Sequence, residues 1–286
     1  MLVNKKIFTD TQGNELRLSL VNQIEQEVKF SGFSAKYVVS GSELYTLNHK
    51  KINVNTGEYV IGNYNTASKV LIDSTTSVKG ICIDVAKTLL TDVMAYKFEN
   101  PNAFSGFLFE QEWMVQKYNG QNTTLGYALQ KLSDNFENLY HGNAAISNEL
   151  FYAVAECIVN DQSEIFQRFN RLKAVKQETN GRLFNFVYDA KNYIDQAFLE
   201  KINLESIARE AKLSEYHFLR LFKTVFNITP YQYILKKRLE YSKILLQQSY
   251  PIQDIALLTS FADSAAYSKA FKSAFGCTPK QFADKN

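Results

Sequence analysis

Residues 213–230 read LSEYHFLRLFKTVFNITP, and residues 262–279 read ADSAAYSKAFKSAFGCTP. The second stretch repeats the first after a shift of 49 residues. The identical pairs are Phe222-Lys223 and Phe271-Lys272, Phe226 and Phe275, Thr229-Pro230 and Thr278-Pro279, and, just beyond, Gln232 and Gln281. Upstream, Ile207-Ala208 corresponds to Ile255-Ala256 after a slip in the turn. Because a solenoid needs at least three repeats, two copies indicate a pair of small units.

Each copy carries residues that begin and end a helix. Before the helix stands a good N-cap, and after it a residue that tolerates the left-handed conformation. These are Ser214 and Asn227 in the first copy, and Asp263 and Gly276 in the second. The Thr-Pro pair that follows starts another helix, with proline at its first position. The pattern predicts two helix-turn-helix units, at about residues 202–226 and 251–275.

The central helix of the first copy has two different faces. One face is apolar at helical spacing and consists of Phe218, Leu221, Phe222 and Val225. The opposite face presents Tyr216, Leu219, Arg220 and Lys223. An arginine can bond guanine O6 and N7 together, an apolar side chain can contact a thymine methyl, and a lysine suits a phosphate. The outer face therefore predicts contact with the major groove of double-stranded DNA.

The helix of the second copy follows the same plan with smaller side chains. Its predicted buried face is Tyr267, Ala270, Phe271 and Ala274. Its predicted outer face is Ala265, Ser268, Lys269 and Lys272, with Ser264 at the helix start. Small side chains allow close approach to base edges but read fewer atoms. Two hairpins packed for stability alone are the alternative, and the two matching basic faces favour DNA binding over it.

The segment between the copies, residues 231–248, is predicted to form a linker helix with Leu235, Leu239, Ser242 and Leu246 along one stripe. About 18–20 residues at ~1.5 Å each span ~27–30 Å. Successive major grooves on one side of DNA are ~34 Å apart. One chain would then place two recognition helices in adjacent grooves. The run Lys236-Lys237-Arg238 fits either phosphate contacts or a solvated helix face.

Charge is unevenly distributed along the 286 residues. Residues 182–286 hold 15 Lys and Arg against 10 Asp and Glu, whereas the whole chain has a net charge of +3. The basic final third suits a module that binds a polyanion, and a solvated surface is the alternative.

A hydrophobic fraction of 45% excludes disorder. With no apolar stretch near the ~18 residues of a membrane span, no apolar N-terminal segment and three scattered cysteines, we expect a cytoplasmic protein without membrane association.

The N-terminal part is predicted to combine strands and helices. Short β-rich runs about 8–12 residues apart over residues 15–85 suggest a sandwich or small barrel. Helical spacing follows at about residues 84–96, 124–140 and 146–176, and the aromatic segment 104–118 fits another strand. The best boundary is Asn180-Gly181. We therefore expect an α+β fold, with a β-sandwich or barrel domain over residues 1–180 and an all-α tandem helix-turn-helix domain over residues 181–286.

The C-terminal part resembles the AraC/XylS family of bacterial transcription regulators over residues 187–286. The residues that carry the resemblance are Ile207-Ala208, Leu213 to Lys223, Thr229 to Ile234, Arg238-Leu239, Ile255-Ala256, Phe261-Ala262-Asp263 and Phe271 to Pro279. The resemblance implies that a first set of side chains lies at the DNA groove, namely Tyr216, Leu219 and Arg220. It implies the same for Ser264, Ala265, Ser268 and Lys269, in agreement with the outer faces.

The chain departs from the family pattern in both turns. Lys212 and Ser260 stand where the family usually has glycine. If these turns need positive φ, each residue costs about 1 kcal/mol. The second recognition helix also lacks the glutamines typical of the family, so we expect the second copy to contribute affinity more than specificity.

The N-terminal part more distantly resembles the cupin-like sensor domain of such regulators. The residues concerned are Tyr37-Val38-Val39-Ser40-Gly41 and Gly57-Glu58-Tyr59-Val60-Ile61. Metal-binding cupins need several His and Glu ligands, and the strand region holds His49 alone, so we expect a metal-free pocket or none. The aromatic side chains of Tyr37, Tyr45 and Tyr59 either line such a pocket or fill the core.

The predicted function is a sequence-specific transcription regulator and activator that binds promoter DNA. The resemblance further implies RNA polymerase as a partner and a small organic effector. Helices 124–140 and 146–176 either make homodimer contacts or cover the sheet. An N-terminal domain that only dimerises or binds a protein is the alternative. A cupin-type enzyme with an appended DNA-binding domain is another, but no acid–base pair or metal motif supports it, so neither catalysis nor a cofactor is expected.

Overall fold

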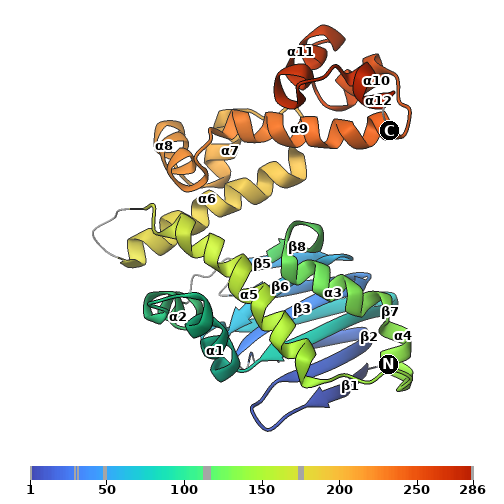
Figure 1. Ribbon diagram of the computed structural model, residues 1–286, viewed down its shortest axis with the longest axis vertical. Coiled ribbons are helices and arrows are strands. Elements are labelled where there is room, and N and C mark those ends of the chain that lie inside the picture. Colours follow the sequence, from blue (N-terminus) through green and yellow to red (C-terminus); the bar gives the residue numbers. More distant parts are fainter. Residues whose placement is uncertain are drawn as a thin grey trace. The chain divides into compact units, whose positions relative to one another are not determined.

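The computed structural model describes residues 2–28, 30, 32–47, 50–111, 117–172 and 177–284 (Figure 1). The chain divides into two compact units between Gln167 and Arg168. The predicted boundary at Asn180-Gly181 instead lies inside α6 (Gln177–Ala197), where Gly181 is buried in helix packing. An α+β first unit and an all-α second unit confirm the predicted fold class.

The first unit is built around one antiparallel sheet of eight strands. The strands are β1 (Leu2–Thr9), β2 (Glu15–Val28), β3 (Phe33–Ser40), β4 (Ser42–Leu47), β5 (Lys50–Asn55), β6 (Glu58–Asn63), β7 (Ser68–Val85) and β8 (Lys117–Asn119). Their order is β1-β2-β7-β3-β6-β8, with β4 pairing both β5 and β7. β7 pairs with β4 through residues 68–71 and with β3 through residues 79–85, so one long strand serves both halves of the sheet.

Helices surround this sheet, and α3 and α5 lie across one of its faces (Figure 1). They are α1 (Lys87–Lys97), α2 (Asn102–Glu110), α3 (Thr124–Asp134), α4 (Phe136–His141) and α5 (Asn148–Phe169), with a short 3-10 helix at Gly120–Asn122. α5 continues across the boundary between the two units. Helices therefore lie in all three predicted segments, although their ends differ and one segment holds two helices.

Three expectations for this unit need correction. The possible strand at residues 104–118 is only partly correct, because residues 104–110 belong to α2, whose side chains Phe104, Phe107 and Leu108 are buried at helical spacing, whereas Lys117 and Tyr118 lie in β8. The predicted helix 124–140 breaks at Asn135, with φ −105° and ψ 13°, into α3 and α4. The strands also begin before residue 15, because β1 pairs with β2. β1 is an edge strand whose polar residues hide its alternation.

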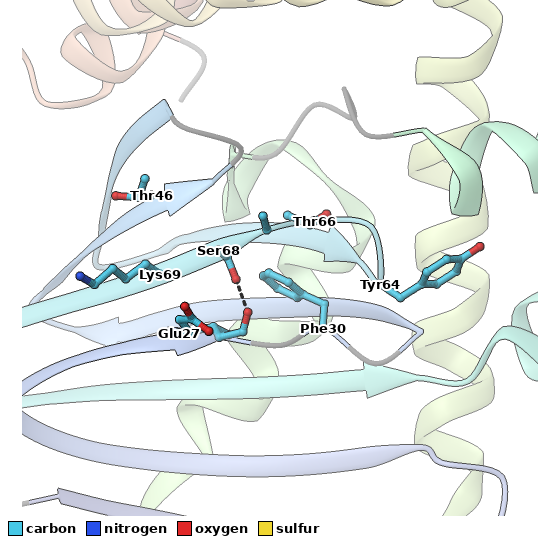
Figure 2. A pocket seen from close by; sticks show the side chains of 9 residues that line it. Glu27, Phe30, Thr46, Tyr64, Thr66, Ser68 and Lys69 are labelled. Carbon is cyan, nitrogen blue, oxygen red and sulfur yellow. Dashed lines mark hydrogen bonds between the residues drawn. The ribbon is translucent and has the colours of Figure 1, made fainter.

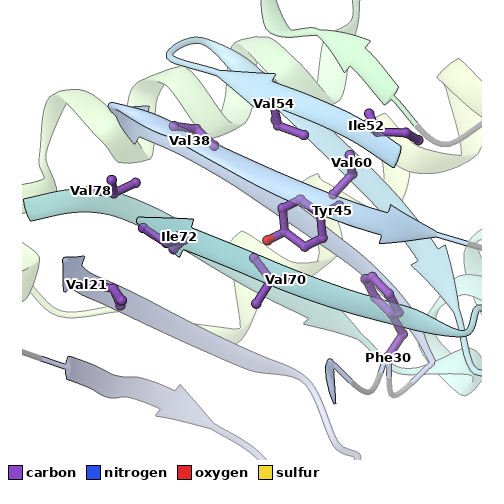
Figure 3. Close-up of a cluster of buried hydrophobic side chains, with 10 residues drawn as sticks. All are labelled: Val21, Phe30, Val38, Tyr45, Ile52, Val54, Val60, Val70, Ile72 and Val78. Atoms are coloured by element: carbon purple, nitrogen blue, oxygen red, sulfur yellow. The ribbon is translucent and has the colours of Figure 1, made fainter. Parts of the chain in front are cut away.

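The inner side of the sheet is filled by apolar side chains (Figure 3). The cluster consists of Val21, Phe30, Val38, Tyr45, Ile52, Val54, Val60, Val70, Ile72 and Val78. Since side chains alternate along a strand, Tyr37 and Tyr59 lie on the other side of the sheet. There Tyr37 Oη donates to Gln130 Oε1 at 2.5 Å, and Tyr59 Oη lies 2.9 Å from Thr123 Oγ1. All three tyrosines belong to the buried core.

The second unit consists of helices (Figure 1). After α6 come α7 (Leu204–Glu210), α8 (Glu215–Phe226), α9 (Pro230–Gln247), α10 (Ile252–Leu258), α11 (Ser264–Phe275) and α12 (Pro279–Ala283). The pairs α7–α8 and α10–α11 are joined by short turns, and α9 runs between them. Within the described ranges, no helix is both long and apolar enough to cross a membrane.

Candidate nucleic-acid interface

α8 is an amphipathic helix with defined ends. Ser214 Oγ accepts a hydrogen bond from the His217 amide at 3.4 Å, and Asn227 ends the helix with φ 60°. The buried side chains are the predicted ones, Phe218, Leu221, Phe222 and Val225. They pack against the start of α9, with the Phe222 ring 5.8 Å from the ring of Tyr233. The opposite face is therefore turned to solvent.

The outer face of α8 carries free cations beside exposed apolar groups. Tyr216 is 78% exposed and Leu219 is 38% exposed, while Arg220 and Lys223 are also exposed. No described carboxylate lies within ion-pair distance of Arg220 or Lys223. Free cations on a helix face can meet phosphates or base edges without first breaking an ion pair.

α11 repeats this arrangement in the second copy. The Asp263 carboxylate accepts from the Ala266 amide at 2.7 Å, and Gly276 ends the helix with φ 74°. Tyr267 and Phe271 are fully buried. The remaining predicted interface residues are Ala265, Lys269 and Lys272, which are exposed, and Ser264 and Ser268, which are half-buried.

The buried face of α11 is narrower than predicted. Ala270 is only half-buried, and Ala274 is exposed. Two large aromatic rings hold the helix in place, so the small alanines at the edge of this face need not be covered. α11 thus presents a wide surface of short side chains, with Lys269 and Lys272 projecting from it.

The turns of the two copies have the same geometry. Lys212 has φ 53° and Ser260 has φ 55°, so both residues adopt the left-handed conformation that favours glycine. The Leu213 amide donates to the Ala208 carbonyl at 3.0 Å, and the Phe261 amide donates to the Ala256 carbonyl at 2.9 Å. The positive φ expected if these turns matched the family's glycine positions is present in both copies.

α9 connects the two copies and begins with a capping box. Thr229 Oγ1 accepts from the Gln232 amide at 3.2 Å, and the Gln232 side chain accepts from the Thr229 amide at 2.9 Å. Thr278 and Gln281 repeat this pattern at the start of α12. The 18 residues of α9 correspond to about 27 Å at the rise of an α-helix.

The basic run on α9 is mostly engaged inside the second unit. Lys236 is exposed, whereas Lys237 lies 3.2 Å from Asp195 of α6. Arg238 donates to three backbone carbonyl groups. Burial alone would raise the pKa of Asp195, but Lys191, Lys237 and the Tyr233 hydroxyl hold this pKa below its ordinary value. Of the three basic side chains in the run, Lys236 alone is free for phosphate.

A groove of about 530 Å³ opens in the first unit between β2, β4 and β7 (Figure 2). Its lining residues are Glu27, Val28, Phe30, Thr46, Tyr64, Thr66, Ala67, Ser68 and Lys69. Ser68 Oγ donates to the Val28 carbonyl at its floor. Sequence reasoning missed these residues because no motif joins them, and only the curl of the sheet brings them together.

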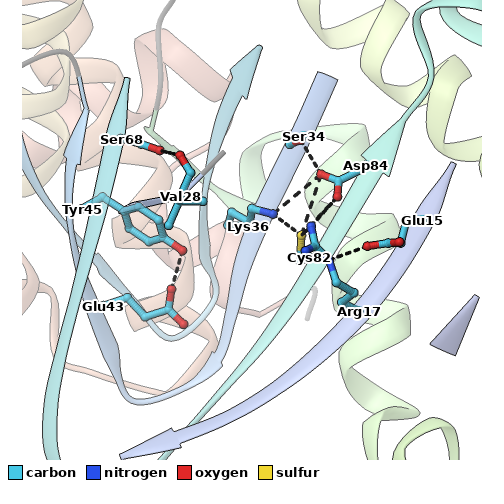
Figure 4. A network of polar contacts seen from close by, with 10 residues as sticks. All are labelled: Glu15, Arg17, Val28, Ser34, Lys36, Glu43, Tyr45, Ser68, Cys82 and Asp84. Atoms are coloured by element: carbon cyan, nitrogen blue, oxygen red, sulfur yellow. Dashed lines mark hydrogen bonds and ion pairs between the residues drawn. The ribbon is translucent and has the colours of Figure 1, made fainter. Parts of the chain in front are cut away.

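A network of charged groups lies in the same sheet (Figure 4). Arg17 Nη2 lies 2.5 Å from Asp84 Oδ2, and Lys36 contacts Cys82 Sγ and lies 3.7 Å from Asp84 Oδ1. Burial raises the pKa of the Cys82 thiol. Because opposite charges face one another here, the network holds β2, β3 and β7 together. His49 lies outside the described residues, and the described ones contain no cluster of three His, Cys, Asp or Glu that could hold a metal ion.

Comparison with known proteins finds a family model within the second unit and several named relatives. A family model described as a helix-turn-helix domain matches residues 207–285. The "probable transcriptional regulator LumQ" of Photobacterium leiognathi is 35% identical over 92 residues, which are 32% of this chain and 37% of LumQ. The chain thus spans little more than a third of that relative.

Two further relatives are matched over most of their own length. The "bifunctional transcriptional activator/DNA repair enzyme AdaA" of Bacillus subtilis is 30% identical over 172 residues, which are 52% of this chain and 81% of AdaA. The "probable transcription factor PqrA" of Proteus vulgaris is 35% identical over 86 residues, which are 30% of this chain and 70% of PqrA.

Proposed function

The chain belongs to the AraC/XylS family of DNA-binding transcription regulators, and we propose that it binds one promoter site with α8 and α11 in successive major grooves. The observation that carries this proposal is the repetition of an amphipathic helix with an unpaired basic outer face. In both copies the cations stand at equivalent positions, Arg220 with Lys269 and Lys223 with Lys272. A packing role alone does not account for cations that lack partners in both helices.

The first helix-turn-helix copy reads bases in this proposal. Arg220 donates to guanine O6 and N7, and Leu219 contacts a thymine methyl. Tyr216, near the helix start, contacts a base edge or the sugar-phosphate backbone. Lys223, one turn after Leu219, neutralises a phosphate. The exposure of all four side chains supports these roles.

The second helix-turn-helix copy contributes affinity more than specificity. Ala265 and Ser268 are too short to reach many base atoms, so they let α11 approach the groove closely. Ser264, at the start of α11, donates a hydrogen bond to the sugar-phosphate backbone of the DNA in this proposal. Lys269 and Lys272 supply phosphate contacts, which depend on salt and not on sequence.

The spacing of the two helices supports simultaneous binding. α9 is about 27 Å long, and adjacent major grooves are about 34 Å apart. The side chains at both ends of α9 and the width of the recognition helices account for the difference between these two lengths.

Activation rather than repression is the regulatory outcome that we propose, with contact to RNA polymerase, because AdaA is named a transcriptional activator.

The first unit is proposed to regulate this binding. Its interior is filled, so the groove beside Phe30 and Tyr64 is the candidate site for a small organic effector. Tyr127 on α3 and Tyr152 on α5 are 66% and 54% exposed, and these helices are the candidates for homodimer contacts. A unit that only dimerises or binds a protein is the alternative. An effector would raise the unfolding temperature by mass action in a ligand screen, whereas pure dimerisation would leave it unchanged.

Selection from a random duplex library at fixed salt tests the DNA proposal. We expect the full-length chain to enrich a motif with two half-sites about one helical turn apart, the first better defined than the second. Enrichment of a single half-site would contradict simultaneous binding by α8 and α11. No preference for any sequence would contradict base reading by the first helix-turn-helix copy.

A further inference from the structure

One guanidinium group joins the two helix-turn-helix units. Arg238, in the middle of α9, donates through Nε to the Phe198 carbonyl and through Nη2 to the Glu200 carbonyl, both at 2.7 Å. These carbonyls belong to the corner between α6 and α7, which leads into the first helix-turn-helix copy. The Nη1 atom of Arg238 donates to the Ser260 carbonyl at 3.1 Å. Ser260 forms the turn of the second copy, between α10 and α11.

Ser260 makes a second connection to the same corner. Its hydroxyl donates to the carbonyl of Leu199. The residue has φ 55°, a conformation that glycine adopts at lower cost. Glycine would have no hydroxyl to donate, so the strained serine supplies a bond between the two helix-turn-helix copies. Lys212, at the same position in the first copy, is exposed and makes no such connection.

These four hydrogen bonds act where α9 alone cannot. A helix fixes the distance between its ends, but helices of this length bend, and bending moves whatever is attached to them. The Arg238 and Ser260 bonds connect the turn of the second helix-turn-helix copy directly to the segment between α6 and α7, where the first copy begins. They therefore constrain the rotation of α11 relative to α8.

We propose that Arg238 and Ser260 form a clamp that sets the angle between α8 and α11, and thereby the half-site spacing that the protein accepts. Both are positioning residues, because neither reaches the outer faces of the recognition helices. The proposal rests on the simultaneous binding proposed above. Each base pair added between the half-sites rotates the second half-site by about 35° relative to the first. Only a fixed angle between α8 and α11 lets the protein discriminate between spacings that differ by one base pair.

The clamp needs arginine in particular. The three acceptors are neutral carbonyls that surround the planar guanidinium, which has five donors in fixed directions. Lysine has the same charge but a single nitrogen, which cannot meet all three carbonyls. Arg238→Lys therefore separates the geometry of the clamp from its charge.

The test measures the affinity of the full-length chain for a series of duplexes. Each duplex carries both selected half-sites, with the spacing shortened by one base pair, unchanged, or lengthened by one or two. A further duplex carries the first half-site with the second scrambled. The variants are Arg238→Lys, Arg238→Gln and Ser260→Gly. Lys236→Met is the matched control, because Lys236 is exposed on the same helix.

We expect wild type to prefer one spacing sharply. In Arg238→Gln the preference for that spacing over its neighbours should fall about tenfold, because hydrogen bonds from a charged donor are worth that much. Arg238→Lys and Ser260→Gly should lose less. Binding to the first half-site alone should stay as in wild type for all three. Lys236→Met removes one exposed cation of the same helix, so any loss of affinity should be equal for all duplexes and the wild-type spacing profile should remain.

The outcomes separate the clamp from the function on which it rests. A wild-type protein with no spacing preference would overturn simultaneous binding itself. A sharp wild-type preference that all three variants retain would overturn the clamp. Ser260→Gly is the safeguard against misfolding, because glycine relieves the backbone strain. If Ser260→Gly lost affinity for the single half-site as strongly as for the pair, the two residues would have a structural role only.

Discussion

The two helix-turn-helix units agree where they are buried and differ where they are exposed. Both bury a pair of aromatic rings at the same positions, Phe218 and Phe222 in one unit and Tyr267 and Phe271 in the other. Both place a non-glycine residue with positive φ in the turn. Their outer faces differ, because the first carries an arginine and two large apolar side chains where the second carries a lysine, alanine and serine. One scaffold thus serves two kinds of DNA contact.

The largest effects are expected in the shared cores. Phe222→Ala and Phe271→Ala each remove a ring that is 0% exposed, which costs about 3–5 kcal/mol. Hydrogen exchange of the full-length chain would show loss of protection across α7–α9 in the first variant and across α9–α12 in the second. Exposed Lys236→Met is the control. Equal loss over both regions in both variants would contradict separate cores and show that the two cores unfold as one cooperative unit.

The next effect distinguishes the two outer faces. Arg220→Ala should weaken binding to the selected site by about 1–3 kcal/mol and relax base preference at one position. Lys269→Ala, at the equivalent position, should weaken binding to all sequences alike. Repeating the library selection with each variant measures both effects. A motif altered equally by the two substitutions would erase the proposed division between base reading and affinity.

A smaller effect concerns the positions where the units are identical. Lys223→Ala and Lys272→Ala should each make the dependence of log affinity on log salt shallower by about one unit. Titrations of one duplex at several salt concentrations measure the slope. Wild-type slopes in either variant would show that this lysine does not contact phosphate.

The two turns offer a comparison of about 1 kcal/mol. Lys212→Gly should stabilise the first helix-turn-helix copy by that amount, because it relieves the left-handed conformation. Ser260→Gly relieves the same strain but loses the hydroxyl bond to Leu199, so its gain should be smaller or absent. Hydrogen exchange of α7–α8 and α10–α11 compares them. A larger gain in Ser260→Gly would contradict a stabilising serine bond.

The smallest effect is a pH dependence confined to α6 and α9. Because the folded pKa of Asp195 lies below its ordinary value, its contribution to stability is complete above the unfolded pKa of about 3.9 and is lost as pH falls through the folded pKa. Asp195→Asn should flatten this loss in exchange of α6 and α9 below about pH 5. An unchanged profile would show that the Lys191–Asp195–Lys237 group does not stabilise the packing of α6 on α9.

Much of the second unit could be predicted from the chain because its information is local. Caps, turn residues and apolar spacing lie within a few residues of the bonds they make, as at Ser214 and Thr229. The first unit was harder. β1 was missed because this edge strand is polar, and a strand remained possible where α2 lies because α2 has aromatic residues on several sides. Their identity depends on what packs against them.

The amino-acid sequence alone determined the repeat, its helices, its turns and the residues on the two outer faces, since each follows from neighbours along one helix. Tertiary structure decided which of those residues are free. It bound Lys237 to Asp195 and Arg238 to three carbonyls, although both belong to a run that looks uniformly basic. It also closed the sheet around ten apolar side chains and left a groove beside them, which one of the ten, Phe30, also lines. Such pairings join residues tens of positions apart, and no local pattern records which distant group a side chain will meet.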